Sequence, residues 1–204
     1  PRRRDDRSLV AVRKHLYALL TRRESADAVA AIEAVDAGRL CRALAKRHPQ
    51  LETRLILLPP PPQSASPKMW KLIAGAQEAS GDVLCVLDDD TQLPDDAFEP
   101  CLAHLAQPGV GLAFGLPCYA SFENLWSGLV SCFVNRNALP TYAPYTSLVE
   151  PFTINGMFYV LERSTYDAIG GFAGLERWAT DDFAVAQHVR KHGPLPGYAY
   201  RTDP

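Results

Sequence analysis

The stretch "DVLCVLDDD", residues 82–90, joins an apolar run to three consecutive aspartates. Every position of 83–87 is apolar, so a strand formed by this run would be apolar on both faces. Such a strand belongs inside a parallel or mixed sheet with helices above and below. In an open α/β sheet, ligands bind beyond the carboxyl ends of the strands, and the aspartates follow directly at such an end. The stretch therefore predicts a layered α/β fold with a candidate site at this strand end.

Further strands and helices alternate along the chain on both sides of this run. Apolar runs predict strands at 28–36, 53–58, 110–117 and 152–162. Helical periodicity and end signals predict helices at 9–20, 38–48, 68–79, 94–106, 121–135 and 180–193. The proline-rich segment 59–67 can form neither element and is expected to be a loop. The alternation favours one α/β domain over residues 8–204, after a charged lead-in of residues 1–7.

Composition and charge narrow the class of protein. The chain has 204 residues, 47% of them hydrophobic, and a net charge of −2, which is typical of a globular domain and gives no reason to expect a nucleic-acid partner. Up to residue 54 there are 13 basic against 7 acidic residues. That flank suits an anionic membrane surface or a nucleotide, and a solvated helix face explains it equally well. The longest apolar stretch is about half a membrane span, so no crossing of the bilayer is expected. The five cysteines show no metal-finger spacing and are interpreted as buried thiols in a reducing compartment.

The three aspartates at 88–90 have two interpretations. They can form a polar turn that caps the next helix, although Asp95 and Asp96 already supply acids there. Alternatively, two carboxylates separated by one residue can hold a divalent cation, with phosphates completing its shell. Three adjacent carboxylates without a cation would repel one another and raise their own pKa values. The cation site is the favoured interpretation.

A second acidic pair occurs in "ATDDF", where Asp181 and Asp182 open a predicted helix. The N-terminal helix dipole favours their ionised form. One such carboxylate could remove the proton of an acceptor hydroxyl while a cation neutralises a departing nucleoside diphosphate. Simple N-capping by Thr180 is the competing interpretation. Phosphoryl or nucleotidyl transfer would use similar carboxylates, but the sequence contains no GxxxxGK[ST] loop.

Four blocks in a fixed order carry a family resemblance: "SPKMWKLIAGAQEASGDVLCVLDDDT", "PGVGLAFGLPCY", "TINGMFYVLER…GGF" and "ATDDFAVAQHV". From about residue 28 to 193 they resemble the ceramide glucosyltransferase-like branch of the inverting, family-2-type glycosyltransferases. The resemblance implies a GT-A fold with a mixed, mostly parallel sheet and helices on both faces. It also implies a nucleotide sugar, commonly UDP-glucose, with Mg²⁺ or Mn²⁺, and transfer to a lipid such as ceramide at the cytoplasmic face of a membrane.

The resemblance also implies roles for individual residues around the donor. Asp36 resembles the family aspartate that contacts the nucleoside, and Lys68 the lysine near the nucleotide, where it could also help neutralise the diphosphate. Asp88 and Asp90 bracket the DXD motif, in which Asp90 is the expected direct metal ligand.

The acceptor side is assigned in the same way. Asp182 resembles the catalytic base, with Asp181 as its neighbour. Asn155 and Gly156 resemble the segment beside the acceptor and the donor sugar.

Two family features are not found. No apolar opening strand precedes "VRKHLYALL", and no Gln/Arg-x-x-Arg-Trp motif follows the catalytic aspartate. The fold is therefore expected to be incomplete at both ends, as a fragment of a membrane-associated enzyme whose anchoring segments lie outside these residues. Other acceptors (a polyprenyl phosphate, a diacylglycerol or a polysaccharide) and a non-catalytic nucleotide-sugar-binding remnant are the alternatives.

Two apolar features have open interpretations. Trp178, four residues before Asp182, could line an acceptor channel or simply pack. The helix at 121–135 could meet lipid as an interfacial element. Core packing is favoured for this helix, because its polar face lacks the expected lysines and arginines.

Overall fold

The computed structural model describes residues 17–20, 27–32, 41–43, 45–88, 91–94, 96–119, 122–148, 152–192 and 198–199. The predicted lead-in of residues 1–7 lies outside these ranges. Among the described helices, none is both long enough and apolar enough to cross a membrane.

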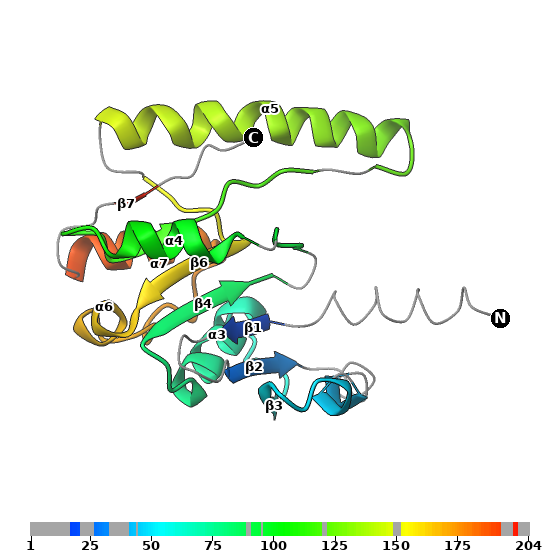
Figure 1. Cartoon of the computed structure of the whole chain (residues 1–204), viewed down its shortest axis with the longest axis vertical. Coiled ribbons are helices and arrows are strands. Elements are labelled where there is room, and N and C mark those ends of the chain that lie inside the picture. Colours follow the sequence, from blue (N-terminus) through cyan, green and yellow to red (C-terminus); the bar gives the residue numbers. More distant parts are fainter. Residues whose placement is uncertain are drawn as a thin grey trace.

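Seven strands form one mixed sheet (Figure 1). They are β1 (Tyr17–Leu20), β2 (Asp27–Ile32), β3 (Glu52–Leu57), β4 (Val83–Leu87), β5 (Leu112–Phe114), β6 (Phe158–Glu162) and β7 (Tyr198–Ala199). Their order across the sheet is β3-β2-β1-β4-β6-β5-β7. Two pairs are parallel, β2 with β3 and β5 with β7, and the other four are antiparallel.

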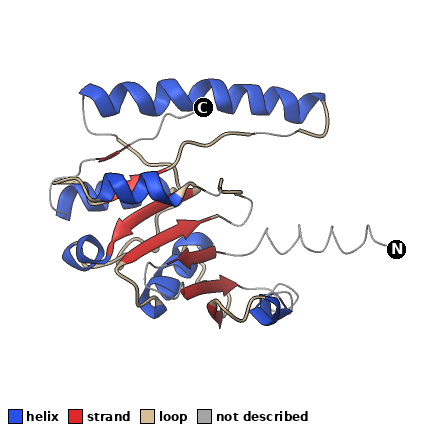
Figure 2. Cartoon of the chain, viewed as in Figure 1, coloured by secondary structure: helices blue, strands red, loops and turns tan. Residues whose placement is uncertain are grey.

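The helices flank these strands (Figure 2). They are α3 (Pro67–Glu78), α4 (Phe98–Leu105), α5 (Leu125–Leu148), α6 (Arg163–Ala168) and α7 (Asp181–His192), and residues 41–43 and 45–47 are also helical. The alternation of side chains along the strands explains the two layers. Leu84 and Val86 of β4 share a buried cluster with residues of α3 and α7, whereas Cys85 shares one with residues of α4. The strand that is apolar on both faces is therefore covered on both faces.

The predicted α/β sheet with helices on both faces is confirmed, but the prediction of mostly parallel pairing is wrong. The apolar run at 83–87 reports only that both faces are buried. It carries no information about the direction of the neighbouring strands, and both neighbours of β4 are antiparallel to it.

Several element boundaries differ from the predictions. Residues 17–20 form β1, between β2 and β4, where helical periodicity predicted a helix. The residues before "VRKHLYALL", where the opening strand was expected to be missing, lie outside the described ranges, so that expectation stays a prediction. Short runs such as "YALL" fit a helix or a strand equally well, and pairing on both sides decides the outcome. The helix α4 begins at Phe98 rather than Pro94, and the Ala97 N–H before it donates to the Pro94 carbonyl at 3.1 Å. The strand β6 begins at Phe158, after Gly156, rather than at residue 152 as predicted.

The helix α5 is longer than predicted and lies apart from the helices that cover the sheet (Figure 1). In its first half the apolar side chains are exposed: Leu125, Trp126, Leu129, Val130 and Phe133. The buried position between them is Ser131. The prediction that this segment packs into the core is therefore wrong for its first half.

The cysteines were expected to be buried. This is confirmed for Cys85 and Cys101, but Cys118 and Cys132 are exposed. Cys132 belongs to α5, whose outward-facing first half places it at the surface.

Candidate active site

The site begins where β4 ends. The backbone N–H of Asp88 donates to the carbonyl of Met157 at 2.8 Å, and this bond holds the end of β4 beside the segment that enters β6. The N–H of Thr91 donates to the carbonyl of Asp88 at 3.1 Å, which gives this strand end a second backbone hydrogen bond. The Asp88 side chain is thereby fixed at the carboxyl end of a central strand, as the sequence predicted.

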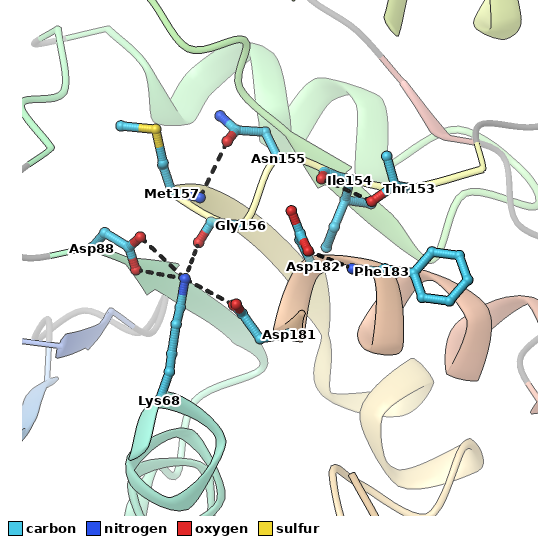
Figure 3. Close-up of polar contacts among 10 residues, drawn as sticks. All are labelled: Lys68, Asp88, Thr153, Ile154, Asn155, Gly156, Met157, Asp181, Asp182 and Phe183. Carbon is cyan, nitrogen blue, oxygen red and sulfur yellow. Dashed lines mark hydrogen bonds and ion pairs between the residues drawn. The ribbon is translucent and has the colours of Figure 1, made fainter. Parts of the chain in front are cut away.

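Lys68 connects this strand end to two other segments (Figure 3). Its Nζ lies 2.9 Å from Asp88 Oδ1 and 2.8 Å from Asp181 Oδ2, and it donates to the carbonyl of Gly156 at 3.0 Å. The side chains of Lys68, Asp88 and Asp181 are 19%, 18% and 14% exposed. At that exposure water screens the charges only partly, so removal of one partner would leave a poorly compensated charge.

The charges of the site act on the Lys68 ammonium in opposite directions. Burial alone would lower its pKa, because burial disfavours the charged form. The carboxylates of Asp181 and Asp88 outweigh burial, and the pKa of Lys68 is raised above its ordinary 10.5. Lys68 is therefore a permanent cation between two carboxylates, rather than a free charge waiting for a phosphate.

The second acidic pair lies at the start of α7. Asp181 faces Lys68, whereas the Oδ1 of Asp182 accepts the N–H of Phe183 at 2.7 Å (Figure 3). The two neighbouring carboxylates thus have different partners: Asp181 is paired with a cation, and Asp182 is oriented by its own helix turn. Among the described side chains no ion pair involves Asp182, so its carboxylate is the better candidate for accepting a proton.

Gly156 is required where these segments meet. A Cβ at this position would lie 3.0 Å from the Cβ of Asp182, 3.1 Å from Asp181 Oδ2 and 3.4 Å from Lys68 Nζ. The absence of a side chain lets both acidic residues and the lysine approach one backbone segment. The sequence placed Gly156 at the site, and the close approach supplies the physical reason.

Substitution of Gly156 with Ala should therefore disturb the site. We expect a loss of about 1–3 kcal/mol in the free energy of unfolding, because the added methyl group forces Asp182 or the 156 segment to move. Urea denaturation measures the loss. Gly128→Ala is the control, since the nearest atom to its Cβ belongs to the exposed ring of Phe122 at 3.2 Å, which can rotate away. Equal stability of the two variants would contradict this account of Gly156.

Asn155 has a structural partner on each side. Its Nδ2 donates to the carbonyl of Gly115 at 2.7 Å, and its Oδ1 accepts the N–H of Met157 at 3.3 Å. The side chain is 6% exposed and joins the end of β5 to the start of β6. Its assignment as a ligand of the nucleotide sugar stays a prediction.

The site also includes two tyrosines that were not among the predicted site residues. Tyr159 is fully buried, and burial together with Asp181 and Asp88 raises its pKa well above 10.0. Its hydroxyl has no hydrogen-bond partner in the described part of the chain. A tyrosine inside the apolar run "FYVLE" was the only available signal. Tyr142 of α5 packs edge-to-face on Phe114 with ring centroids 5.5 Å apart, and burial followed by Asp182 raises its pKa. No sequence pattern connects Tyr142 with Asp182.

The described side chains of the site supply only some of the ligands that a divalent cation needs. Asp36 and Asp90 lie outside the described residues, so their predicted roles stay predictions. Within the described ranges, no group of three or more His, Cys, Asp or Glu side chains is placed to hold a metal ion. Asp88 supplies one carboxylate of suitable chemistry at a strand end, and Lys68 shares it. The described residues thus fit one part of a cation site, next to a fixed ammonium.

A solved structure and a protein-family model both match this chain. The crystal structure of glucosyl-3-phosphoglycerate synthase from Mycobacterium tuberculosis, in complex with UDP, is similar to 87% of this chain at 17% identity and a TM-score of 0.39. The chain spans 61% of the length of that structure. No protein with a curated description matches. The family model of glycosyl transferase family 21 matches residues 30–195, which contain every described residue of the site and most of the chain. The protein therefore belongs to glycosyl transferase family 21.

Proposed function

We propose that this glycosyltransferase moves a sugar, with inversion, from a nucleotide sugar such as UDP-glucose to the hydroxyl of a lipid such as ceramide. The observation that carries the proposal is that the two adjacent aspartates at the start of α7 have different partners. Asp181 is bound to Lys68, and Asp182 is held by the N–H of Phe183 at the same helix start. Asp181 can thus fix Lys68 while Asp182 acts as the base. This arrangement suits a reaction in which an acceptor hydroxyl directly displaces the diphosphate at a sugar carbon.

In this reaction Asp182 is the general base. Its carboxylate takes the proton of the acceptor hydroxyl as the hydroxyl oxygen bonds to the anomeric carbon of the sugar. The bond from that carbon to the diphosphate breaks, and the nucleoside diphosphate leaves with the electron pair. The bond of Asp182 Oδ1 to the Phe183 N–H, at 2.7 Å, orients the other oxygen toward the acceptor.

Lys68 and Asp88 prepare the donor side. The ammonium balances two carboxylates at one strand end, so an incoming diphosphate meets a site whose negative charge is already reduced. Asp36 is proposed to hold the nucleoside. Asp88 and Asp90 are proposed to hold Mg²⁺ or Mn²⁺, which would neutralise the diphosphate when bound.

The lipid acceptor and a position at a membrane face are supported by the surface of α5. Its first half exposes Leu125, Trp126, Leu129, Val130 and Phe133, while its second half carries Tyr142 to the neighbourhood of Asp182. A helix with an apolar outer stripe that reaches the catalytic base is suited to an enzyme whose acceptor lies in a bilayer.

The proposal is tested by incubating the protein with UDP-glucose and phosphatidylcholine vesicles that contain ceramide. Mass spectrometry of the lipid fraction should detect the glucosylated lipid. UDP binding without transfer, to ceramide or to a polyprenyl phosphate or diacylglycerol, would show a nucleotide-sugar-binding protein instead. Transfer to another of these lipids alone would correct the acceptor and keep the reaction.

Metal removal provides a separate prediction. With EDTA, the affinity for UDP measured by calorimetry should fall by about tenfold or more, about 1.4 kcal/mol, and added Mg²⁺ or Mn²⁺ should restore it. Asp88→Asn should reduce the restoration, because one carboxylate of the set is lost. An affinity that is the same with EDTA and with Mg²⁺ would contradict the metal assignment.

A further inference from the structure

Three aromatic side chains lie in contact next to the proposed base. The ring centroids of Phe152 and Phe183 are 5.1 Å apart, and those of Trp178 and Phe183 are 6.1 Å apart. Phe183 directly follows Asp182 and holds its carboxylate through its N–H. We call Phe152, Trp178 and Phe183 the aromatic platform.

The platform is exposed although it is well anchored. Phe152 is 60% and Trp178 46% exposed, and neither belongs to the buried clusters of the sheet. The Nε2 of Gln187, on α7, donates to the carbonyl of Phe152 at 2.8 Å, and the N–H of Trp178 donates to the carbonyl of Leu175 at 3.1 Å. Three different backbone segments thus hold the rings at the surface. Rings that are fixed there and not used by the core are available to a ligand.

We propose that the aromatic platform binds the alkyl chain of the acceptor lipid next to the hydroxyl that Asp182 deprotonates. This inference rests on the proposed function. The acceptor hydroxyl must lie at the Asp182 carboxylate, so the part of the acceptor adjoining that hydroxyl must lie over the residues around it. On the side of Phe183 those residues are the platform. Aromatic rings cover a large apolar area and lose little side-chain entropy when an alkyl chain packs on them.

The surroundings favour an alkyl chain over a carbohydrate, which also stacks on aromatic rings. The helix that brings Tyr142 toward Asp182 also carries the exposed apolar stripe of α5, which includes Leu129 and Phe133. Its 24 residues contain one charged side chain, Arg136, and no acid. A lipid chain needs apolar area, and the exposed apolar stripe supplies it on the same helix that reaches toward Asp182.

The test uses acceptors that share one headgroup and differ only in chain length, ceramides with N-acyl chains of two to eight carbons. For the parent protein, kcat/KM should rise with chain length. In Phe152→Ala and Trp178→Ala, kcat/KM for the longest chain should fall about tenfold through KM, and the rise with chain length should flatten. Trp178→Tyr should restore most of the loss. The affinity for UDP should not change in any of them.

Leu57→Ala is the matched control, because Leu57 is 60% exposed on β3, outside the platform. A second readout is independent of turnover. In a Trp70→Phe/Trp126→Phe protein Trp178 is the one tryptophan left in this sequence and can be excited selectively. A bromine-labelled acyl chain on the ceramide should quench its fluorescence, less so when Phe152 is also replaced by Ala.

The outcomes separate this inference from the proposed function. If both platform variants transfer sugar with the parent's dependence on chain length, the platform does not bind the alkyl chain, and the proposed function still stands. If the labelled ceramide quenches Trp178 but sugar is transferred to no acceptor, the platform binds lipid and the proposed function is wrong. Competition by soluble sugars that is as strong as competition by ceramides would overturn the choice of an alkyl chain.

Discussion

Replacement of Asp182 with Asn is expected to lower kcat for sugar transfer by about 10²–10⁴-fold and to leave the affinity for UDP nearly unchanged. An amide cannot accept the proton of the acceptor hydroxyl, and general-base catalysis is worth about that factor. The side-chain oxygen of Asn can still accept the N–H of Phe183, so the helix start should keep its geometry. Transfer is followed with radiolabelled UDP-glucose, and UDP binding by calorimetry.

Asp181→Asn is the informative companion of this variant. Asp181 pairs with Lys68 at 2.8 Å, so its loss should change donor affinity and stability rather than the proton transfer. The two substitutions remove one charge each from adjacent positions and should differ in the parameter that they change. Transfer at the parent rate by the Asp182 variant would show that the assignment of the base is wrong.

Replacement of Lys68 with Met should cost about 3 kcal/mol of the free energy of unfolding. Lys68, Asp88 and Asp181 are all less than one fifth exposed, and removal of the ammonium that pairs with both carboxylates leaves two negative charges close together without that ion pair. Urea denaturation at neutral pH measures the effect. Lys191→Met, at an exposed position in the last turn of α7, is the control and should change stability by less than about 0.5 kcal/mol.

A double-mutant cycle and a pH series identify the cause of that loss. Adding Asp181→Asn to Lys68→Met should recover part of the stability, because one of the unbalanced carboxylates is removed. The pKa of Lys68 is raised in the folded protein, so its contribution is complete below the ordinary value of 10.5 and is lost as pH rises through the raised value. The difference between the parent and Lys68→Met should therefore be constant near neutral pH and shrink above about pH 10.5. A purely steric role of the lysine would leave the difference independent of pH.

The sequence predicted which residues lie at this site better than it predicted the contacts among them. Lys68, Asp88, Gly156 and Asp181 were all assigned to one site, and the structure brings the four together. The sequence could not show that Lys68 binds two carboxylates and not a phosphate alone. That depends on the meeting of α3, β4 and α7, which no local pattern encodes.

Strand direction and surface exposure were beyond the sequence for a similar reason. Residues 83–87 showed that β4 is buried on both faces, but the direction of β1 and β6 follows from how the chain is routed between them. Core packing was expected for the first half of α5 because its polar face lacks the lysines and arginines of an interfacial helix. Its neighbours decide its exposure, and only Ser131 among the positions there faces inward.

The Lys68 ammonium also has a consequence for the order of folding. It joins residues 20 and 88 positions away along the chain, at Asp88 and Gly156, and Asp181 lies farther still. Contacts of such long sequence separation form only after large loops have closed, and they belong to the high-contact-order part of a fold. An intermediate that contains only the segment from α3 to β4 could hold the Lys68–Asp88 pair but not the base. Competence for transfer should therefore appear in a single late step, together with the docking of α7, and nascent chains that end before His192 should lack it.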